Sequence, residues 1–186
     1  MNPACNSVVL SIVVAWVVSS AVRLGLGPQP ARDCCAAQSS EKPLPAFERL
    51  KGLAGSWVRL DDQGRPTEEV THVFRVTAAG TAVEEVVYPG TAKEMVTVYF
   101  VRRGTLQLTH YCMAGNQPHM LARPEVDPNR VEFVCDGTGV ESEDERHMHH
   151  AEFTFLAEDR FDTRWQLLEE GQPTQLVALS LTRQPR

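Results

Sequence analysis

The chain has 186 residues, of which 42% are hydrophobic and 23% are charged, so it can bury a core and is not disordered by composition. The net charge is −6 and no run of Lys or Arg occurs, which argues against a nucleic-acid-binding protein because phosphate contacts need a clustered basic surface. The length favours one folded domain with an appendage.

The appendage begins with an apolar stretch of 15 residues, VVLSIVVAWVVSSAV, at positions 8–22. A membrane-spanning helix needs about 20 residues, so this stretch better suits the core of a signal peptide. Small residues at Ser19, Ser20 and Ala21 offer a cleavage site. Residues 1–22 are therefore predicted to be a signal peptide and the protein to be exported, either periplasmic or secreted. The alternative is an uncleaved membrane anchor, because the leader lacks Lys and Arg and Arg23 follows the stretch.

Residues 23–45 are rich in Pro, Gly and Ser and are predicted to be a flexible tether, which leaves residues 46–186 for the folded domain. Two cysteines, Cys112 and Cys135, lie in that domain. Export would permit a disulfide between them. One predicted strand separates them, however, and would hold their Cα atoms about 9–10 Å apart, beyond the limit of about 7 Å for a disulfide. We therefore expect the two thiols to be unbonded.

The folded domain opens with a short helical turn, since Phe47, Leu50 and Leu53 share one apolar face. Alternating apolar residues and frequent turn signals then predict ten strands, at residues 56–60, 69–76, 81–88, 94–101, 106–113, 119–123, 130–135, 148–156, 160–168 and 175–183. Short connections favour an all-β antiparallel up-and-down β-barrel of about ten strands. A two-sheet sandwich is the alternative.

Gly55-Ser56-Trp57 opens the first strand after a helical turn, and Arg183 ends the last strand. The order of these motifs resembles the calycin pattern of lipocalins and their relatives. The resemblance implies a structural barrel closure in which Trp57 lies across the closed end and Arg183 packs over it. The segments YPGT (88–91), EMVTVY (94–99), LTHYC (108–112) and GNQP (115–118) are similar to a bacterial exported family of this group without an assigned function.

The same face assignment predicts a ligand site inside the barrel. If Arg183 points inward, the alternation of apolar residues places His72, His110 and His149 on inner faces as well. Apolar walls with a few convergent polar groups are typical of a ligand pocket. The predicted ligand-binding residues are His72, Thr97, Tyr99, His110, His149 and Trp165. The alternative is that the histidines fill a barrel without a useful cavity.

No cofactor and no metal site are predicted. His147 and His149 share a face within the run at residues 146–150, but zinc needs three or four ligands with a satisfied second shell, and Glu152 shares its face with His150 instead. Haem-binding nitrobindin-like barrels carry a ligating His near the C-terminus, whereas no His follows His150 here. No catalytic residues are predicted either, since His110 and Cys112 lack an oxyanion hole.

The leading hypothesis is an exported β-barrel that binds a small, largely apolar molecule without catalysis. The alternatives are a lipocalin-like enzyme, a hydrolase or isomerase with a polar lumen, and a filled structural or interaction barrel. The expected partner is a small-molecule ligand. Nucleic acid is not expected, and a membrane is expected only through an uncleaved N-terminal segment.

Overall fold

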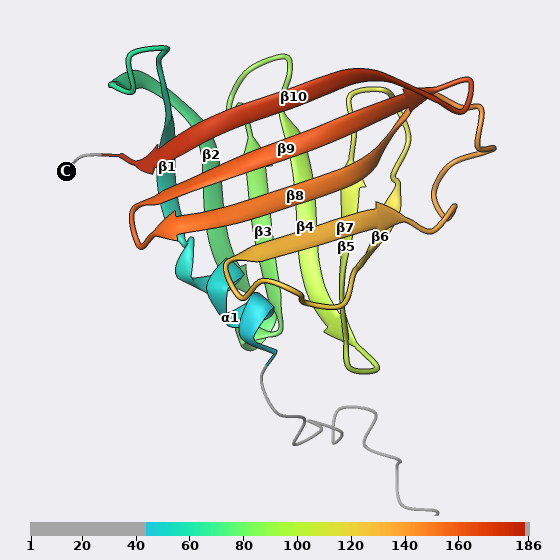
Figure 1. The fold of residues 1–186 in the computed structure, drawn as a ribbon, viewed down its shortest axis with the longest axis horizontal. Coiled ribbons are helices and arrows are strands. Elements are labelled where there is room, and N and C mark those ends of the chain that lie inside the picture. The colour runs from blue at the N-terminus through green and yellow to red at the C-terminus, as the bar shows by residue number, and fades with distance from the viewer. Residues whose placement is uncertain (1–43, 185–186) are drawn as a thin grey trace, which may run out of the picture. The chain divides into compact units, whose positions relative to one another are not determined.

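The computed structural model describes residues 44–184, which form a closed barrel of ten antiparallel strands (Figure 1). Each strand pairs with its neighbours in sequence, and β1 pairs with β10 to close the sheet. The strands are β1 (Gly55–Leu60), β2 (Pro66–Thr77), β3 (Ala82–Val87), β4 (Met95–Arg102), β5 (Thr105–Tyr111), β6 (His119–Ala122), β7 (Arg130–Cys135), β8 (His147–Ala157), β9 (Arg160–Glu169) and β10 (Gln172–Arg183). The up-and-down barrel is thus confirmed over the sandwich. The predicted signal peptide and all but the end of the tether lie outside the described residues.

The largest differences from the predicted strands are the starts of β2 and β10. These strands begin at Pro66 and Gln172, three residues earlier than expected. Proline weakens a strand prediction because it cannot donate a hydrogen bond to the ladder. Pro66 and Pro173 nevertheless pair with the neighbouring strands, at the first and second positions of β2 and β10. A missing donor is tolerated there because the hairpin turn is adjacent.

The helix α1 (Pro45–Gly52) lies at one end of the barrel, which we term the closed end (Figure 1). Pro45 stands at the start of the helix, where its fixed φ favours helix formation. Phe47 and Leu50 are buried in the core, as the helical periodicity predicts. A 3-10 turn, η1 (Ala78–Gly80), joins β2 to β3. Within residues 44–184, no helix has the length and apolarity to cross a membrane.

Aromatic side chains fill the closed end. Trp57, Phe74, Phe153 and Phe161 are all fully buried. The Trp57 and Phe161 ring centroids lie 4.7 Å apart, edge to face, and those of Phe74 and Phe161 lie 5.9 Å apart in the same arrangement. Each such pair adds about 0.5–1.5 kcal/mol beyond the burial of its surface. This half of the lumen is therefore core rather than pocket.

Arg183 packs over Trp57 at the closed end. The guanidinium carbon lies 4.5 Å from the Trp57 ring centroid. Its nitrogens donate hydrogen bonds to the carbonyl oxygens of Gly52 (2.9 Å) and Ala54 (2.8 Å), where α1 ends. A Cβ at Gly55 would lie 2.9 Å from Arg183 Nη1, and the φ of Gly55 is +132°. The Gly-x-Trp pattern thus has a physical reason, since the glycine leaves room for the arginine.

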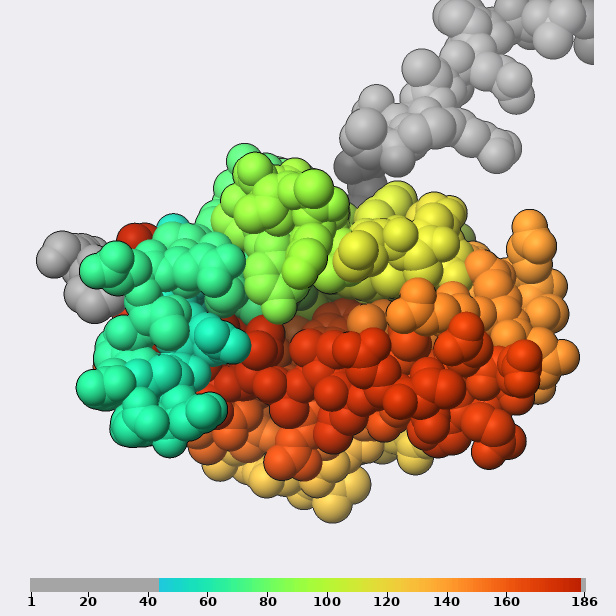
Figure 2. Space-filling view, turned by 90° about the horizontal axis from the view of Figure 1, so that it is seen from above, coloured from blue at the N-terminus to red at the C-terminus, as the bar shows by residue number. Residues whose placement is uncertain are grey.

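The opposite end, which we term the open end, carries five connections, namely β1–β2, β3–β4, β5–β6, β7–β8 and β9–β10. Figure 2 shows a hollow between β10 (red) and the β3–β4 connection (green). Val177 and Leu179 of β10 pack against the core yet stay partly exposed, whereas Leu181, nearer the closed end, is fully buried. The lumen is therefore filled at one end and accessible at the other.

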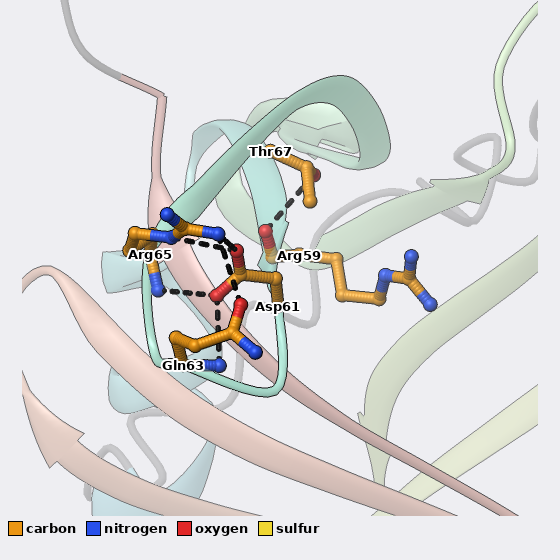
Figure 3. A network of polar contacts seen from close by, with 5 residues as sticks. All are labelled: Arg59, Asp61, Gln63, Arg65 and Thr67. Carbon is orange, nitrogen blue, oxygen red and sulfur yellow. Dashed lines mark hydrogen bonds and ion pairs between the residues drawn. The ribbon is translucent and has the colours of Figure 1, made fainter.

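A polar network holds the β1–β2 turn at the open end (Figure 3). Asp61 Oδ1 accepts hydrogen bonds from the backbone N–H groups of Gln63 (3.0 Å) and Arg65 (2.8 Å), and Oδ2 accepts one from Arg65 Nε (2.9 Å). The Thr67 hydroxyl donates to the Arg59 carbonyl oxygen at 2.9 Å. The backbone N–H of Arg65, and next its guanidinium, hold the pKa of Asp61 below its usual value. These bonds fix the shape of the turn.

Candidate functional site

Three polar side chains form a row across β3, β4 and β5 on the inner face of the barrel. Glu85 pairs in register with Thr97, and Thr97 pairs with His110. Cross-strand partners point to the same face of a sheet, and all three side chains are buried. Thr97 Oγ1 lies 2.9 Å from His110 Nδ1. This hydrogen bond leaves the other ring nitrogen of His110 free to face the lumen.

Glu85 joins this row to two further residues. The Tyr99 hydroxyl donates a hydrogen bond of 2.5 Å to Glu85 Oε2. His72 Nε2 lies 3.6 Å from Glu85 Oε1, too far for a good hydrogen bond. The other ring nitrogen, His72 Nδ1, lies 3.0 Å from Thr71 Oγ1. One carboxyl oxygen is therefore well paired and the other is not.

Burial controls the ionisation of these groups. It raises the pKa of Glu85 from 4.5 to about 7, opposed by the hydrogen bonds from Tyr99 and Thr97. It lowers the pKa of both His72 and His110 from 6.5 to about 4. The spacing of His72 and Glu85 is within reach of an ion pair, but both pKa shifts favour the neutral forms. Burial therefore favours the uncharged form of all three side chains.

The opposite wall of the lumen comes from β9. The Trp165 ring centroid lies 4.9 Å from that of His110, across the barrel. Thr163 lies two residues away on the same face of β9 and is buried. Within residues 44–184, Glu85 Oε1, His110 Nε2 and Thr163 Oγ1 are buried without a hydrogen-bond partner. Buried polar atoms are normally paired, so these three atoms mark where the lumen can hold a polar group.

Most of the sequence-predicted residues lie in this one site. The structure brings together His72, Thr97, Tyr99, His110 and Trp165. The remaining residue, His149, contacts His147 instead. Trp57 and Arg183 lie at the closed end, where the resemblance to calycins placed them.

Glu85, the residue that connects the site, is not among the residues predicted from the sequence. A signal for it exists, because Glu85 lies between Val83 and Val87 in a strict alternation. Both valines are buried on the inner face, and Glu85 shares that face. The outward neighbour Glu84 bonds to Arg75 on the outer surface. A carboxylate on an apolar face was therefore the available clue.

A second cluster lies at the open end, on β7 and β8. Cys135 Sγ and one ring nitrogen each of His147 and His149 all lie within 4.8 Å of one another. Cys112 and Cys135 are both free thiols. The sequence places only the two histidines on one face, and the third potential metal ligand, Cys135, comes from the neighbouring strand.

Two external pockets, of about 690 and 440 Å³, border α1 at the closed end. The larger is lined mainly by the β4–β5 and β6–β7 connections, and the smaller by residues around Arg49 and Phe155. None of the buried polar residues of the lumen lines either pocket. We place the candidate site in the lumen because three of the five buried, unpaired side-chain atoms of residues 44–184 lie on its inner face.

Comparison with protein-family models and with curated proteins finds no match to this chain. The function is therefore argued from the geometry of the lumen.

Proposed function

We propose that the barrel binds a small, largely apolar molecule, without catalysis, in the half of its lumen nearer the open end. The observation that supports this proposal is the set of three buried, unpaired polar atoms, Glu85 Oε1, His110 Nε2 and Thr163 Oγ1. Leaving a buried polar atom unpaired costs about 1–3 kcal/mol. A ligand that supplies a hydroxyl or carbonyl group to these atoms would recover that free energy.

The walls of the lumen favour an apolar ligand body. Trp165 and Val87 are nearly buried, and Val177 and Leu179 extend the apolar surface toward the open end. The polar part of the ligand should be uncharged, because the site itself favours neutral groups and burying a charge without a partner is costly. An alcohol, ketone or amide on a hydrocarbon frame fits these conditions.

The proposal includes a lipocalin-like role outside the cytoplasm. It rests on the apolar stretch at residues 8–22 and on the order of the Gly-x-Trp and terminal Arg motifs. An exported carrier needs an accessible lumen, as a small ligand must enter from solvent. Intact mass measurement of the chain from its own host tests the processing, since removal of the signal peptide would shorten it at the N-terminus.

Native mass spectrometry of the full chain purified from its own host is the direct test of ligand binding. The expected result is a bound small molecule that is recovered on denaturation and is identical after it is bound again by the protein. Conversion of that molecule into another compound on incubation with the protein would instead favour the lipocalin-like hydrolase or isomerase. The pKa of about 7 for Glu85 gives that second candidate a specific basis, because a group that titrates near neutral pH can transfer protons.

His110→Ala should weaken binding of a neutral fluorescent probe, N-phenyl-1-naphthylamine, or of the retained ligand. Loss of one buried hydrogen bond is worth about 1.5 kcal/mol, or about tenfold in Kd, for a ligand that uses His110 Nε2. The affinity for the apolar probe should fall less than the affinity for the retained ligand. His119→Ala is the matched control, since His119 bonds to Asp136 outside the lumen. Equal binding by both variants would contradict the lumen site, and failure of the wild type to bind either molecule would favour a filled structural barrel.

A further inference from the structure

We propose that Cys135, His147 and His149 form a zinc-binding site at the open end of the barrel. These residues supply one thiolate and two imidazole ligands, a donor set suited to Zn²⁺. The site is separate from the polar row around Glu85 and does not rest on ligand binding in the lumen.

Strand register brings the three residues together. Cys135 of β7 pairs with Met120 of the neighbouring strand β6, and it lies two residues after Phe133 on its own strand. Both of these residues are fully buried, so the thiol shares the inner face with them. One residue earlier, Val134 pairs with His150 of β8, where the pairing of β7 with β8 ends, and His149 lies one residue further, near Cys135. His147 lies two residues before His149 and is 2% exposed. The thiol and the two rings therefore face one point from two adjacent strands.

The spacing of the donor atoms fits a tetrahedral ion. His147 Nε2 and His149 Nδ1 lie 3.2 Å apart, and all three donors are within 4.8 Å of one another. Bonds of about 2.0–2.1 Å to nitrogen and about 2.3 Å to sulfur place tetrahedral donors about 3.3–3.6 Å apart. The histidines already have this separation, and a side-chain shift on the order of 1 Å would bring the thiol into place.

The surrounding contacts hold the first histidine in the tautomer that a metal needs. His147 Nδ1 lies 2.6 Å from the Glu145 carbonyl oxygen, so Nδ1 carries the proton and Nε2 presents its lone pair. The buried Asn116 fixes this segment, because its Nδ2 donates to Glu145 Oε1 (2.7 Å) and to the Arg146 carbonyl oxygen (2.9 Å). Metal-binding histidines commonly donate their second N–H to a carbonyl or carboxylate in this way.

Three protein ligands leave one position of the tetrahedron for an exchangeable ligand. Among the described residues, the cluster contains no fourth His, Cys, Asp or Glu. Structural zinc sites usually have four protein ligands, whereas sites with three keep a position for water or substrate. Zinc held here would present a Lewis-acidic position at the mouth of the lumen.

Titration of the full chain with Co²⁺, followed by competition with Zn²⁺, tests the proposal. Cys5, Cys34 and Cys35 are first replaced by Ser, because these thiols could bind Co²⁺ themselves. The expected result is one equivalent of Co²⁺ with a thiolate charge-transfer band and the intense visible bands of four-coordinate cobalt, both removed by Zn²⁺. Cys135→Ser should abolish the charge-transfer band, and His149→Ala should weaken affinity by at least about 100-fold, more than loss of an outer-shell partner.

Two matched controls distinguish this site from other thiols and histidines. Cys112→Ser and His150→Ala should leave the spectrum and the affinity unchanged, as His150 lies nearest Glu132 on the outer face. The proposal is wrong if the parent protein gives no charge-transfer band, if the band survives Cys135→Ser, or if His149→Ala binds like the parent. His147 and His149 would then be an ordinary hydrogen-bonded pair. Cys135→Ser is nearly isosteric and keeps the test valid should His149→Ala fold poorly.

Discussion

Trp57→Ala is expected to lower the free energy of unfolding by about 3–5 kcal/mol, the range for truncating a buried aromatic side chain. The indole is fully buried, its N–H donates a hydrogen bond of 2.7 Å to the Leu53 carbonyl oxygen, and its ring contacts Phe161 edge to face. Truncation would leave that carbonyl unpaired and Arg183 without its aromatic partner. Urea denaturation of the full chain, monitored by circular dichroism, measures the effect.

Two variants identify the source of this loss. Tyr111→Ala removes an aromatic side chain that is 51% exposed on β5, and it should change stability by no more than about 0.5 kcal/mol. Trp57→Phe keeps a ring at the closed end but loses the N–H bond to Leu53, so its decrease in the free energy of unfolding should lie between those of Tyr111→Ala and Trp57→Ala. If Trp57→Ala were no more destabilising than Tyr111→Ala, the indole would not organise the closed end.

Glu85→Gln should become more stable, relative to the wild type, as the pH rises from 5 to 8. The folded state raises the pKa of Glu85 from 4.5 to about 7, so it holds a proton that the unfolded chain releases above pH 4.5. The stability that this proton contributes is complete below pH 4.5 and is lost as the pH rises through 7. Linkage gives a change of about 2–3 kcal/mol between pH 5 and 8. Glutamine does not titrate and lacks this loss.

The free energy of unfolding of Glu85→Gln is compared with that of the wild type at each pH, because two histidines change stability with pH in the opposite direction. His72 and His110 have folded-state pKa values of about 4, so their contribution is complete above pH 6.5 and is lost as the pH falls through 4. His72 lies 3.6 Å from Glu85, so the comparison is made in a His72→Gln background, where only the His110 contribution remains and cancels between the two proteins. Glu84→Gln, which removes an outer-face carboxyl bonded to Arg75, is the matched control. A pH dependence for Glu85→Gln no steeper than that for Glu84→Gln would show that the buried carboxyl does not take up a proton on folding.

Trp57 stabilises the folded barrel, whereas the buried Glu85 carboxylate destabilises it at high pH. Trp57 and its neighbours stabilise the closed end by burying apolar surface. Above pH 7 the Glu85 carboxylate is charged in a buried lumen, and it has one well-made hydrogen bond, from Tyr99. A chain that retained this residue for stability alone would do better with an apolar one of similar volume. This cost supports the proposal that the polar row binds a ligand.

The sequence by itself determined the number of strands, their order and, for the strands that carry His72 and His110, the inner face. Period-two alternation is a local property, so residues such as His72 and His110 reveal their face through the apolar neighbours beside them. Short connections then force each strand to pair with the next along the chain. The closing pair, β1 with β10, was predicted through the likeness of Trp57 and Arg183 to a known pattern rather than through periodicity.

Only the tertiary structure decided which inward residues meet. Strand register and barrel shear place Glu85 beside Tyr99 and His72, and they place His110 against Trp165 across the lumen. They also bring Cys135 to His149 from a neighbouring strand, which separates that histidine from the other predicted residues. Alternation gives a side chain its face but not its height in the barrel, because height depends on pairing between residues far apart in sequence.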